Sequence, residues 1–570
     1  MLARHERGDQ HSLARKLTPS GREEGRSAWP TKPDVVLWLV DDQGWGNAGY
    51  HNDNVITPHM NQLALYEGTI LQRHYTYPWC APSRSALMTG IMPHLGLQGD
   101  SQRVPQSVVM LPQVMKAAGY STHHIGKWHL GMLRTWQYPT SRGFDTSVGF
   151  MNGAEDYNTQ RVGGTEAPTD WGCEGVDFQE SATPALNRNG TFSMSWMHSE
   201  IYLAINRSIS AAPLFVFVAL QAMHSPNPGP AALAGFISKY EASGIRDARF
   251  AETNALITMA DKLLAHAVEL LRATKRWDTT LLVHLSDNGA QITDSEGTHP
   301  PPLPGSPWAS QGNNWPLRGM KRSFFEGGVR VPAFVSGGAL PSAMRGKSLS
   351  GYVHIADWFL TIAELAGSDQ IPSRQGSSMS MASFLDGTRG SPRSGMVLGA
   401  GDTASTCNHN EAVIEGSWKL INGSIPCDWA TWQGPLFPNV TASKSTASRL
   451  EKASASRPTT CILTDTTYLF NIEDDPTEQV NLADSNPSRV ALLLAKLAQA
   501  REDAKADPFE SNHDHAVHDR PALCTEYRDA HEGFLGPYMD GRLVRDLTEA
   551  KVNIRHPLAF ADPDTYTDEG

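Results

Sequence analysis

Two pairs of polar residues each follow an apolar run of the kind that forms buried strands. They are Asp41 with Asp42, and Asp287 with Asn288. Open α/β sheets bind ligands at the carboxyl ends of their strands, so these side chains could meet at one sheet edge. Their oxygen atoms suit calcium or magnesium, and the shortage of cysteine at these strand ends argues against zinc. The alternative is that each pair caps a turn, since Asp and Asn before Gly are common turn residues.

A single cysteine stands at the start of a segment with helical character. Residues 79–90 read Trp-Cys-Ala-Pro-Ser-Arg-Ser-Ala-Leu-Met-Thr-Gly, in which the cysteine is Cys80. Proline is favoured in the first turn of a helix, so Pro82 places Cys80 at a helix N-terminus. Unpaired backbone amides and the helix dipole attract anions at that position. The alternative is a buried apolar cysteine with no chemical role.

Apolar runs and helical stripes alternate along the larger, N-terminal part of the chain. Buried strands are predicted at Asp34–Val40, Ser121–Ile125, Pro213–Leu220 and Thr279–Leu285, and helices at Met110–Ala118 and Ala255–Ala273. Strands that alternate with helices are typical of an α/β domain with a largely parallel sheet. We therefore expect residues 33–400 to form a large mixed, mostly parallel sheet flanked by helices.

The apolar runs become shorter towards the C-terminus. Short apolar runs at Ala412–Leu420 and Thr467–Asn471 precede a predicted helix at Pro487–Arg501. These features predict a smaller C-terminal α+β domain over residues 401–570, with an antiparallel sheet and a helix. Residues 1–32 are rich in arginine and poor in apolar residues, and we expect them to form a leader or a disordered extension.

The amino-acid composition excludes several classes of protein. The 570 residues contain 48 Lys and Arg against 60 Asp and Glu, which gives a net charge of −12. A nucleic-acid-binding protein would need a basic surface, so we expect no nucleic-acid partner. No apolar run reaches the length of a membrane helix, so we expect no membrane partner. The 6 cysteines are too few for a scaffold built on disulfides.

Further motifs occur in order around these residues. They are Asp41-Asp-Gln-Gly-Trp45, Thr57-Pro-His59, Cys80-Ala-Pro-Ser-Arg84, Gly126-Lys-Trp-His-Leu-Gly131, Arg142-Gly-Phe-Asp145, Gln221-Ala-Met-His-Ser-Pro226, Ser286-Asp-Asn-Gly289, Leu317-Arg-Gly-Met-Lys321, Glu326-Gly-Gly-Val-Arg330 and His354-Ile-Ala-Asp-Trp358. Together they resemble the type I, formylglycine-dependent sulfatases of the alkaline-phosphatase-like superfamily, and they are most similar to the arylsulfatase B group. The resemblance is strong over Pro33–Gly367 and weaker in the C-terminal domain.

The resemblance implies a metal ion and a modified residue. Asp41, Asp42, Asp287 and Asn288 match the family's ligands for one calcium ion, preferred over magnesium, which agrees with the all-oxygen set above. Cys80 matches the cysteine that a formylglycine-generating enzyme converts to formylglycine in this family. The hydrated aldehyde has two hydroxyls on one carbon: one attacks sulfur and expels the alcohol, and the other then drives elimination of sulfate.

The resemblance also implies which side chains move protons. Asp287, on the metal, would accept the proton of the attacking hydroxyl, and His129 would take the second proton during elimination. His224 would act as the general acid that protonates the leaving oxygen.

The resemblance also implies which side chains bind the sulfate group and orient the formylglycine. Lys127, His224 and Lys321 would bind the sulfate group, and Arg84 would orient the formylglycine. Taken in isolation, either lysine could be an ordinary surface residue, and His129 or His224 could be a structural histidine. Their positions inside matched motifs favour the functional interpretation.

The sequence therefore predicts an enzyme that hydrolyses a sulfate monoester of a sugar or an aryl alcohol. Two alternatives stay open. A phosphomonoester or phosphodiester hydrolase of the same superfamily would use the same metal-binding fold. A non-catalytic protein that binds sulfated glycans would keep the lysines but would not need Cys80.

The other cysteines and the N-terminal residues give information about the cellular compartment of the protein. The five cysteines besides Cys80 allow at most two disulfides, and Cys407 with Cys427 or Cys461 is one hypothesis. The resemblance implies a secreted, lysosomal or endomembrane glycoprotein, although no signal peptide is visible in the sequence. N-glycosylation sequons, in about the number expected by chance, occur at Asn189, Asn206, Asn422 and Asn439.

Overall fold

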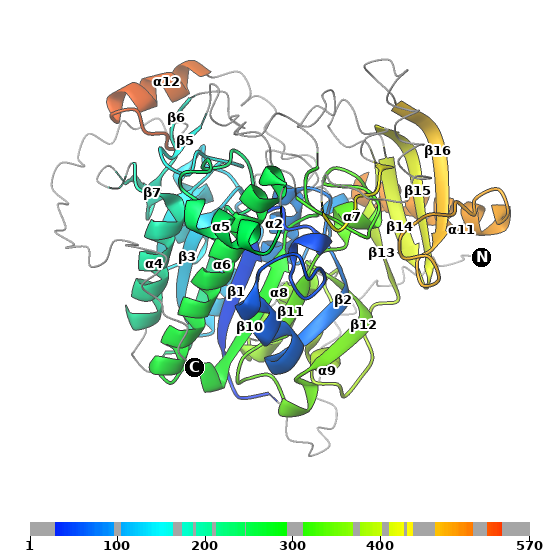
Figure 1. Cartoon of the computed structure of the whole chain (residues 1–570), viewed down its shortest axis with the longest axis horizontal. Helices are drawn as coiled ribbons and strands as arrows, with labels where there is room; N and C mark the ends of the chain where they lie inside the picture. The colour runs from blue at the N-terminus through cyan, green and yellow to red at the C-terminus, as the bar shows by residue number, and fades with distance from the viewer. Residues whose placement is uncertain are drawn as a thin grey trace, which may run out of the picture.

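The computed structural model of the protein describes most of the chain between residues 29 and 537 (Figure 1). The described residues are 29–95, 104–162, 174–185, 188, 190–207, 212–245, 247–292, 312–368, 377–401, 410–426, 430–436, 462–505 and 521–537. Several predicted features lie outside these residues: the leader as far as residue 28, the pairing of Cys407 with Cys427 or Cys461, and the sequons at Asn189 and Asn439.

Strand β1 (Asp34–Val40) lies at the centre of the molecule and is buried along its whole length. Val35, Leu37 and Leu39 pack into the apolar core on one face of the sheet, and the side chains between them pack into the core on the other face. A strand covered on both faces needs apolar residues at consecutive positions, because successive side chains point to opposite faces. The continuous apolar run is thereby explained, and the predicted buried strand is confirmed.

Within the described residues, the large sheet has the strand order β12-β2-β11-β10-β1-β9-β3-β4-β7-β8. The bounds of the other strands are β2 Thr69–Tyr75, β3 Ser121–Lys127, β4 Thr146–Phe150, β7 Gln179–Glu180, β8 Thr183–Pro184, β9 Leu214–Leu220, β10 Thr280–Ser286, β11 Ala333–Ser336 and β12 Lys347–His354. Strands β10, β1, β9, β3 and β4 are parallel neighbours, while β11, β7 and β8 pair antiparallel with their neighbours. The predicted mixed, mostly parallel sheet is confirmed.

Helices cover both faces of this sheet (Figure 1). One face packs against α4 Ser193–Arg207, α5 Ala234–Ala242 and α6 Ala248–Ala273, and the other against α2 Cys80–Thr89, α3 Leu111–Ala117, α8 Asp357–Leu365 and α9 Ala382–Leu385. Two short helices, α1 Pro58–Gln62 and α7 Glu326–Val329, lie in loops. Helix α6 begins before the predicted Ala255, because the Asp247 side chain accepts a hydrogen bond from Phe250 N at 2.9 Å and caps the helix there.

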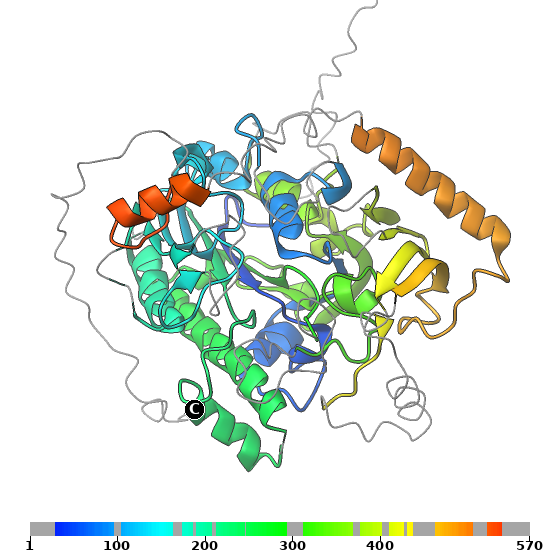
Figure 2. The same cartoon turned by 90° about the horizontal axis from the view of Figure 1, so that it is seen from above.

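A separate four-stranded antiparallel sheet, with helix α11 beside it, forms at the C-terminal side (Figure 2). Its elements are β13 Gly395–Gly399, β14 Asn410–Glu415, β15 Trp418–Pro426, β16 Ile462–Asn471 and α11 Pro487–Lys505. One face of this sheet, with Ile414 and Phe470, joins the main core, while the other, with Val413 and Leu469, packs on α11. The predicted small antiparallel sheet with a helix is confirmed.

The apolar run noted at Ala412–Leu420 spans parts of two strands. The structure has two strands there, β14 and β15, which pair antiparallel as a hairpin. Gly416, at φ 57°, forms the turn between them. Glycine adopts this left-handed conformation without steric cost, so the chain reverses at this point.

The last described helix, α12 (Pro521–Ala530), lies far from the small sheet in both views (Figures 1 and 2). The chain after it pairs with the short strand β6 (Gly175–Val176), where Val176 N donates to Gly533 O at 2.9 Å. Strand β6 in turn pairs with β5 (Arg161–Val162). None of the described helices combines the length and apolar character needed to cross a membrane.

A buried lysine joins the small sheet to the large one. The Lys419 side chain on β15 is fully buried, and its Nζ lies 2.8 Å from Glu326 Oε1 on α7 and 3.0 Å from Glu478 Oε1. Tyr75 at the end of β2 donates its hydroxyl to Glu326 Oε2 at 2.9 Å. This network ties the two sheets together through charges that are hidden from solvent.

Replacing Lys419 by Met is expected to lower the free energy of unfolding by about 3–5 kcal/mol, because Glu326 and Glu478 would lose their shared buried cation. Urea unfolding of the wild type and the variant measures this difference. Lys496→Met is the control, because it removes only an exposed pair with Glu415 and should cost less than about 1 kcal/mol. A loss in Lys419→Met no larger than that of the control would contradict the proposed link between the sheets.

Candidate active site

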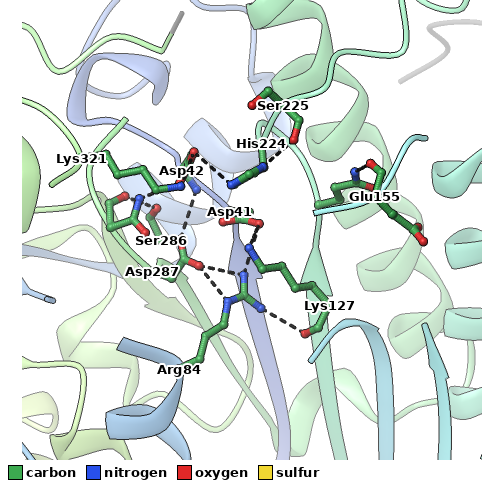
Figure 3. Close-up of polar contacts among 12 residues, drawn as sticks. Asp41, Asp42, Arg84, Lys127, Glu155, His224, Ser225, Ser286, Asp287 and Lys321 are labelled. Atoms are coloured by element: carbon green, nitrogen blue, oxygen red, sulfur yellow. Dashed lines mark hydrogen bonds and ion pairs between the residues drawn. The ribbon is translucent and has the colours of Figure 1, made fainter. Parts of the chain in front are cut away.

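The polar pairs that follow two predicted strands meet at one edge of the large sheet (Figure 3). Asp41 and Asp42 follow β1, Asp287 and Asn288 follow β10, and β1 and β10 are parallel neighbours. All four side chains are buried. Asp42 N donates to Asp287 Oδ1 at 3.2 Å, and Asn288 Nδ2 donates to Asp42 Oδ1 at 2.7 Å. The structure therefore brings the four residues together as a single cluster.

Two buried lysines lie against these carboxylates. Lys127, the last residue of β3, places its Nζ 2.7 Å from Asp41 Oδ2. Lys321, in the chain between β10 and β11, places its Nζ 2.8 Å from Asp42 Oδ1. Burial by itself would disfavour the charged Lys321 ammonium, but the neighbouring Asp42 carboxylate raises the pKa of Lys321 above its ordinary value.

Arg84 supplies a third buried cation. Its Nε donates to Asp287 Oδ2 at 2.9 Å, and its Nη2 forms an ion pair with the same oxygen at 2.8 Å. Its Nη1 donates to Lys127 O at 3.1 Å. Arg84 lies four residues after Cys80 on α2, so it ties that helix to the ends of β10 and β3. The sequence did not predict this contact of Arg84 with the carboxylate cluster.

Cys80 is the first residue of α2 and is 3% exposed. His129 and His224 lie beside its side chain. Burial by itself would raise the pKa of the thiol, but the Lys127 and Lys321 charges and the two histidines hold the pKa of Cys80 well below its ordinary value. Among the described residues Cys80 is the free cysteine, whereas Cys524 is disulfide-bonded.

The two histidines approach from different strand ends. His224, after β9, donates from Nδ1 to Ser225 O at 2.6 Å, and its Nε2 faces Asp42 Oδ2 at 3.9 Å. This bond to a carbonyl fixes the tautomer and the direction of the ring. His129 follows β3 and is 4% exposed, with its backbone at φ 60°. Asp42 has φ 59°, and non-glycine residues in this region cluster at functional sites, where the surrounding structure holds them.

The cluster offers oxygen atoms for a hard cation. Asp41 Oδ1 and Asn288 Oδ1 are buried, and within the described part of the chain neither has a hydrogen-bond partner. Such atoms are costly to bury unless they bind something, and a cation would satisfy them. Ligand atoms of Asp41, Asp42, Cys80 and His224 also lie within 4.8 Å of one another. An unmodified Cys80 thiolate would therefore add a sulfur ligand, which zinc accepts, beside these oxygen donors.

Asp287 differs from the other carboxyl groups. Burial, together with the nearby negative charge of Asp41, raises the pKa of Asp287 to about 8. Asp41 responds in the opposite direction: burial opposes its ionisation, but Lys127, His224 and Arg84 hold the pKa of Asp41 below its ordinary value. Neighbouring carboxyl groups whose pKa values are shifted in opposite directions can hold different protonation states at neutral pH.

One part of the site could not be found from the sequence. Residues 430–436, which lie between β15 and β16, contact the segment that carries Lys321, and Gly319 N donates to Thr431 O at 2.8 Å. These residues follow no motif and are more than 100 positions away from Lys321 in the sequence. The only sequence signal for this region was the general change to shorter apolar runs towards the C-terminus.

Comparisons with known proteins agree with this geometry. The sequence model of the Sulfatase family matches residues 33–368. Arylsulfatase J of Mus musculus is 30% identical over 507 residues, covering 85% of this chain and 78% of the relative. N-acetylgalactosamine-6-sulfatase of Homo sapiens is 28% identical over 362 residues, covering 60% of this chain and 64% of the relative.

Solved structures with the same fold extend over nearly the whole chain. The crystal structure of Ps i-CgsB in complex with k-i-k-neocarrahexaose has a TM-score of 0.65 at 21% identity and covers 86% of this chain and 97% of that one. A structure solved in complex with its substrate D-glucosamine-2-N,6-O-disulfate has a TM-score of 0.56 at 14% identity. The match covers 85% of this chain and 100% of that one.

The family match covers more than half of the chain, and the match to arylsulfatase J extends well beyond it. The structural neighbours share the large mixed sheet and have the alkaline-phosphatase-like fold. The chain therefore belongs to the type I sulfatase family of sulfuric ester hydrolases.

Proposed function

We propose that the protein hydrolyses a sulfate monoester of a sugar, with Cys80 in its formylglycine form as the nucleophile. The observation that carries this proposal is the position of Cys80 at the N-terminus of α2, beside His129 and His224 and close to two lysine charges. The formylglycine hydrate would supply a hydroxyl nucleophile together with a second hydroxyl on the same carbon. The cluster of Asp41, Asp42, Asp287 and Asn288 lies next to it.

The carboxylate cluster would hold one calcium ion. Its donors are Asp41, Asp42, Asp287 and Asn288, of which Asp41 Oδ1 and Asn288 Oδ1 are buried acceptors that a cation would satisfy. A bound calcium would add positive charge beside the sulfate oxygens.

Two lysines and a helix end would bind the sulfate group. Lys127 and Lys321 lie on two sides of the carboxylates, and Cys80 is the first residue of α2. Fixed charges in a buried site stabilise an anion more strongly than the same charges would in water. A small basic pocket of this kind is compatible with the acidic composition of the whole chain.

Three side chains would move protons. Asp287, held ionised by the bound cation, would take the proton of the attacking hydroxyl. His129 would take the proton of the second hydroxyl, and His224, held by Ser225 through Nδ1, would protonate the leaving oxygen from Nε2. Arg84 would keep Asp287 in place through a hydrogen bond and an ion pair.

The substrate class rests on what related proteins bind. Structures with this fold have been solved with neocarrahexaose and with a glucosamine disulfate, and a relative is named for its action on sulfated N-acetylgalactosamine. A formylglycine-generating enzyme is the partner that Cys80 would require. The disulfide at Cys524 supports a secretory or lysosomal compartment, because disulfides persist in oxidising environments.

The Cys80 peptide of the active protein is expected to be about 18 Da lighter than the unmodified peptide, as conversion of a thiol to an aldehyde requires. Peptide mass spectrometry measures this difference. Cys80→Ala should lower turnover of an aryl sulfate about a thousandfold or more, whereas Ser85→Ala, in the next turn of α2, should retain most of it. A fully alkylatable Cys80 thiol in active protein would overturn the proposed nucleophile. If Cys80→Ala keeps its affinity and biological effect, a non-catalytic glycan-binding protein is favoured instead.

The protein is expected to prefer sulfate over phosphate esters. The measurement compares kcat/KM for 4-nitrophenyl sulfate and for 4-nitrophenyl phosphate, which differ only at the group transferred. We expect the sulfate value to be about a hundredfold higher or more, because the nucleophile proposed here serves sulfate elimination. The opposite order would identify a phosphohydrolase of the same fold.

Calcium is expected to stabilise the protein as well as activate it, because ligand binding to the folded state raises its stability. Thermal unfolding with calcium, magnesium or zinc, after removal of metals with a chelator, measures the shift. Asp42→Asn should weaken the calcium-dependent shift, while the surface control Asp145→Asn, paired with Lys116, should retain it. A larger shift with zinc than with calcium would contradict the calcium assignment.

A further inference from the structure

Lys321 lies at the end of a segment that no helix or strand supports. Residues 312–321 form turns and extended chain, with an isolated bridge between Arg318 and Trp432. The Lys321 side chain is nevertheless buried, with its Nζ 2.8 Å from Asp42 Oδ1. Since regular secondary structure does not hold this segment, contacts with other parts of the chain must do so.

On one side the segment is held by the loop after β10. Lys321 N donates to Ala290 O at 3.0 Å, and Asn314 Nδ2 donates to the same carbonyl at 2.9 Å. Ala290 N donates in return to Asn314 Oδ1 at 2.9 Å. Ala290 lies two residues after Asn288, so these bonds join Lys321 to the carboxylate cluster.

On the other side the segment is held by residues 430–436, which we name the clamp loop. Gly319 N donates to Thr431 O at 2.8 Å, and Asn314 N donates to Gln433 Oε1 at 2.7 Å. The clamp loop comes from the small C-terminal sheet, between β15 and β16. The segment is therefore enclosed between the large sheet and a part of the chain that lies more than 100 residues further on.

Arg318 makes the most extensive of these contacts. Its Nε donates to Ala430 O at 2.9 Å and its Nη1 donates to Glu478 O at 3.1 Å. Its Cζ atom lies over aromatic rings from both sides of the contact, with ring centroids 4.1 Å away at Phe325, 4.4 Å at Trp432 and 5.2 Å at Tyr468. A planar guanidinium can bond to two carbonyls and stack on rings at the same time, which a lysine ammonium cannot do.

We propose that Arg318 is a positioning residue for Lys321, and that through it the small C-terminal sheet sets where the sulfate-binding ammonium lies. This inference rests on the proposed function, in which Lys321 binds the sulfate group. Arg318 lies only three residues before Lys321, and Gly319 between them is itself bonded to the clamp loop. Loss of the guanidinium frees the start of this short span and lets Lys321 move away from Asp42.

The direct test measures how well Lys321 is protected from an amine reagent. The full-length protein is treated with limiting acetic anhydride, and the acetylation of Lys321 relative to the equally buried Lys127 is read by peptide mass spectrometry. Arg318→Met is expected to raise this ratio about tenfold, because local opening exposes the ammonium. Arg318→Lys keeps the positive charge, but it cannot donate to both carbonyl oxygens while it stacks on the aromatic rings. It should therefore raise the acetylation ratio by a smaller factor than Arg318→Met does.

The matched control is Arg272→Met, which removes another guanidinium that stacks on an aromatic ring, 5.2 Å from Trp277, at a distant surface. Its acetylation ratio should stay within about twofold of the wild type. An unchanged ratio in Arg318→Met, or equal increases at Lys321 and Lys127, would overturn the positioning role. Should Arg318→Met not fold, Arg318→Lys carries the same comparison.

Enzyme kinetics provide a second test of the positioning role of Arg318. Arg318→Met should lower kcat/KM for an aryl sulfate about 10–100-fold, mainly through KM, and should raise the inhibition constant of inorganic sulfate by a similar factor. A fall in kcat alone, with sulfate inhibition unchanged, would argue against a role through Lys321. If the wild type hydrolyses no sulfate ester, the proposed function fails, whereas the acetylation ratio still decides whether Arg318 positions Lys321.

Discussion

The burial of three aspartates at the ends of β1 and β10 is the constraint on which the rest of the site depends. A buried carboxylate costs several kcal/mol unless a cation lies close to it. Arg84, Lys127 and Lys321 supply these cations, with N···O distances between 2.7 Å and 2.9 Å. They come from helix α2, strand β3 and an irregular segment, so the fold must bring three distant parts of the chain to one sheet edge. Packing on both faces of β1 makes that edge rigid.

The same charges also act on the cysteine at the start of α2. Two of the cations that neutralise the aspartates, Lys127 and Lys321, also lie close enough to Cys80 to hold the pKa of its thiol well below its ordinary value. A site that favours an anion at this position is suited to a sulfate group. The small C-terminal sheet takes part in this arrangement, because its clamp loop and Lys419 hold the chain on both sides of Lys321. The site is thus built by both sheets, although its motifs lie in the larger part of the chain.

Much of the architecture was predictable because it depends on local patterns. The continuous apolar run of β1, the helix that begins at Cys80 and the alternation of strands with helices follow from which side chains must be buried. The bounds of individual elements were not predictable where one residue changes the course of the chain. Gly416 turns the predicted run at Ala412–Leu420 into a hairpin, and the Asp247 cap starts α6 before its apolar stripe begins. Single turn and cap residues have little weight in a pattern that spans many positions.

The sequence by itself determined the identity of the reactive groups, since the residue types and order of the motifs around Cys80, Asp41 and Asp287 indicate the family and its chemistry. Only the tertiary structure decided which groups neutralise one another. It pairs Arg84 with Asp287 and encloses the Lys321 segment between the large sheet and the clamp loop. The physical reason is that ion pairs and backbone hydrogen bonds act over a few ångströms in space. Partners separated by 100 residues or more leave no spacing pattern along the chain.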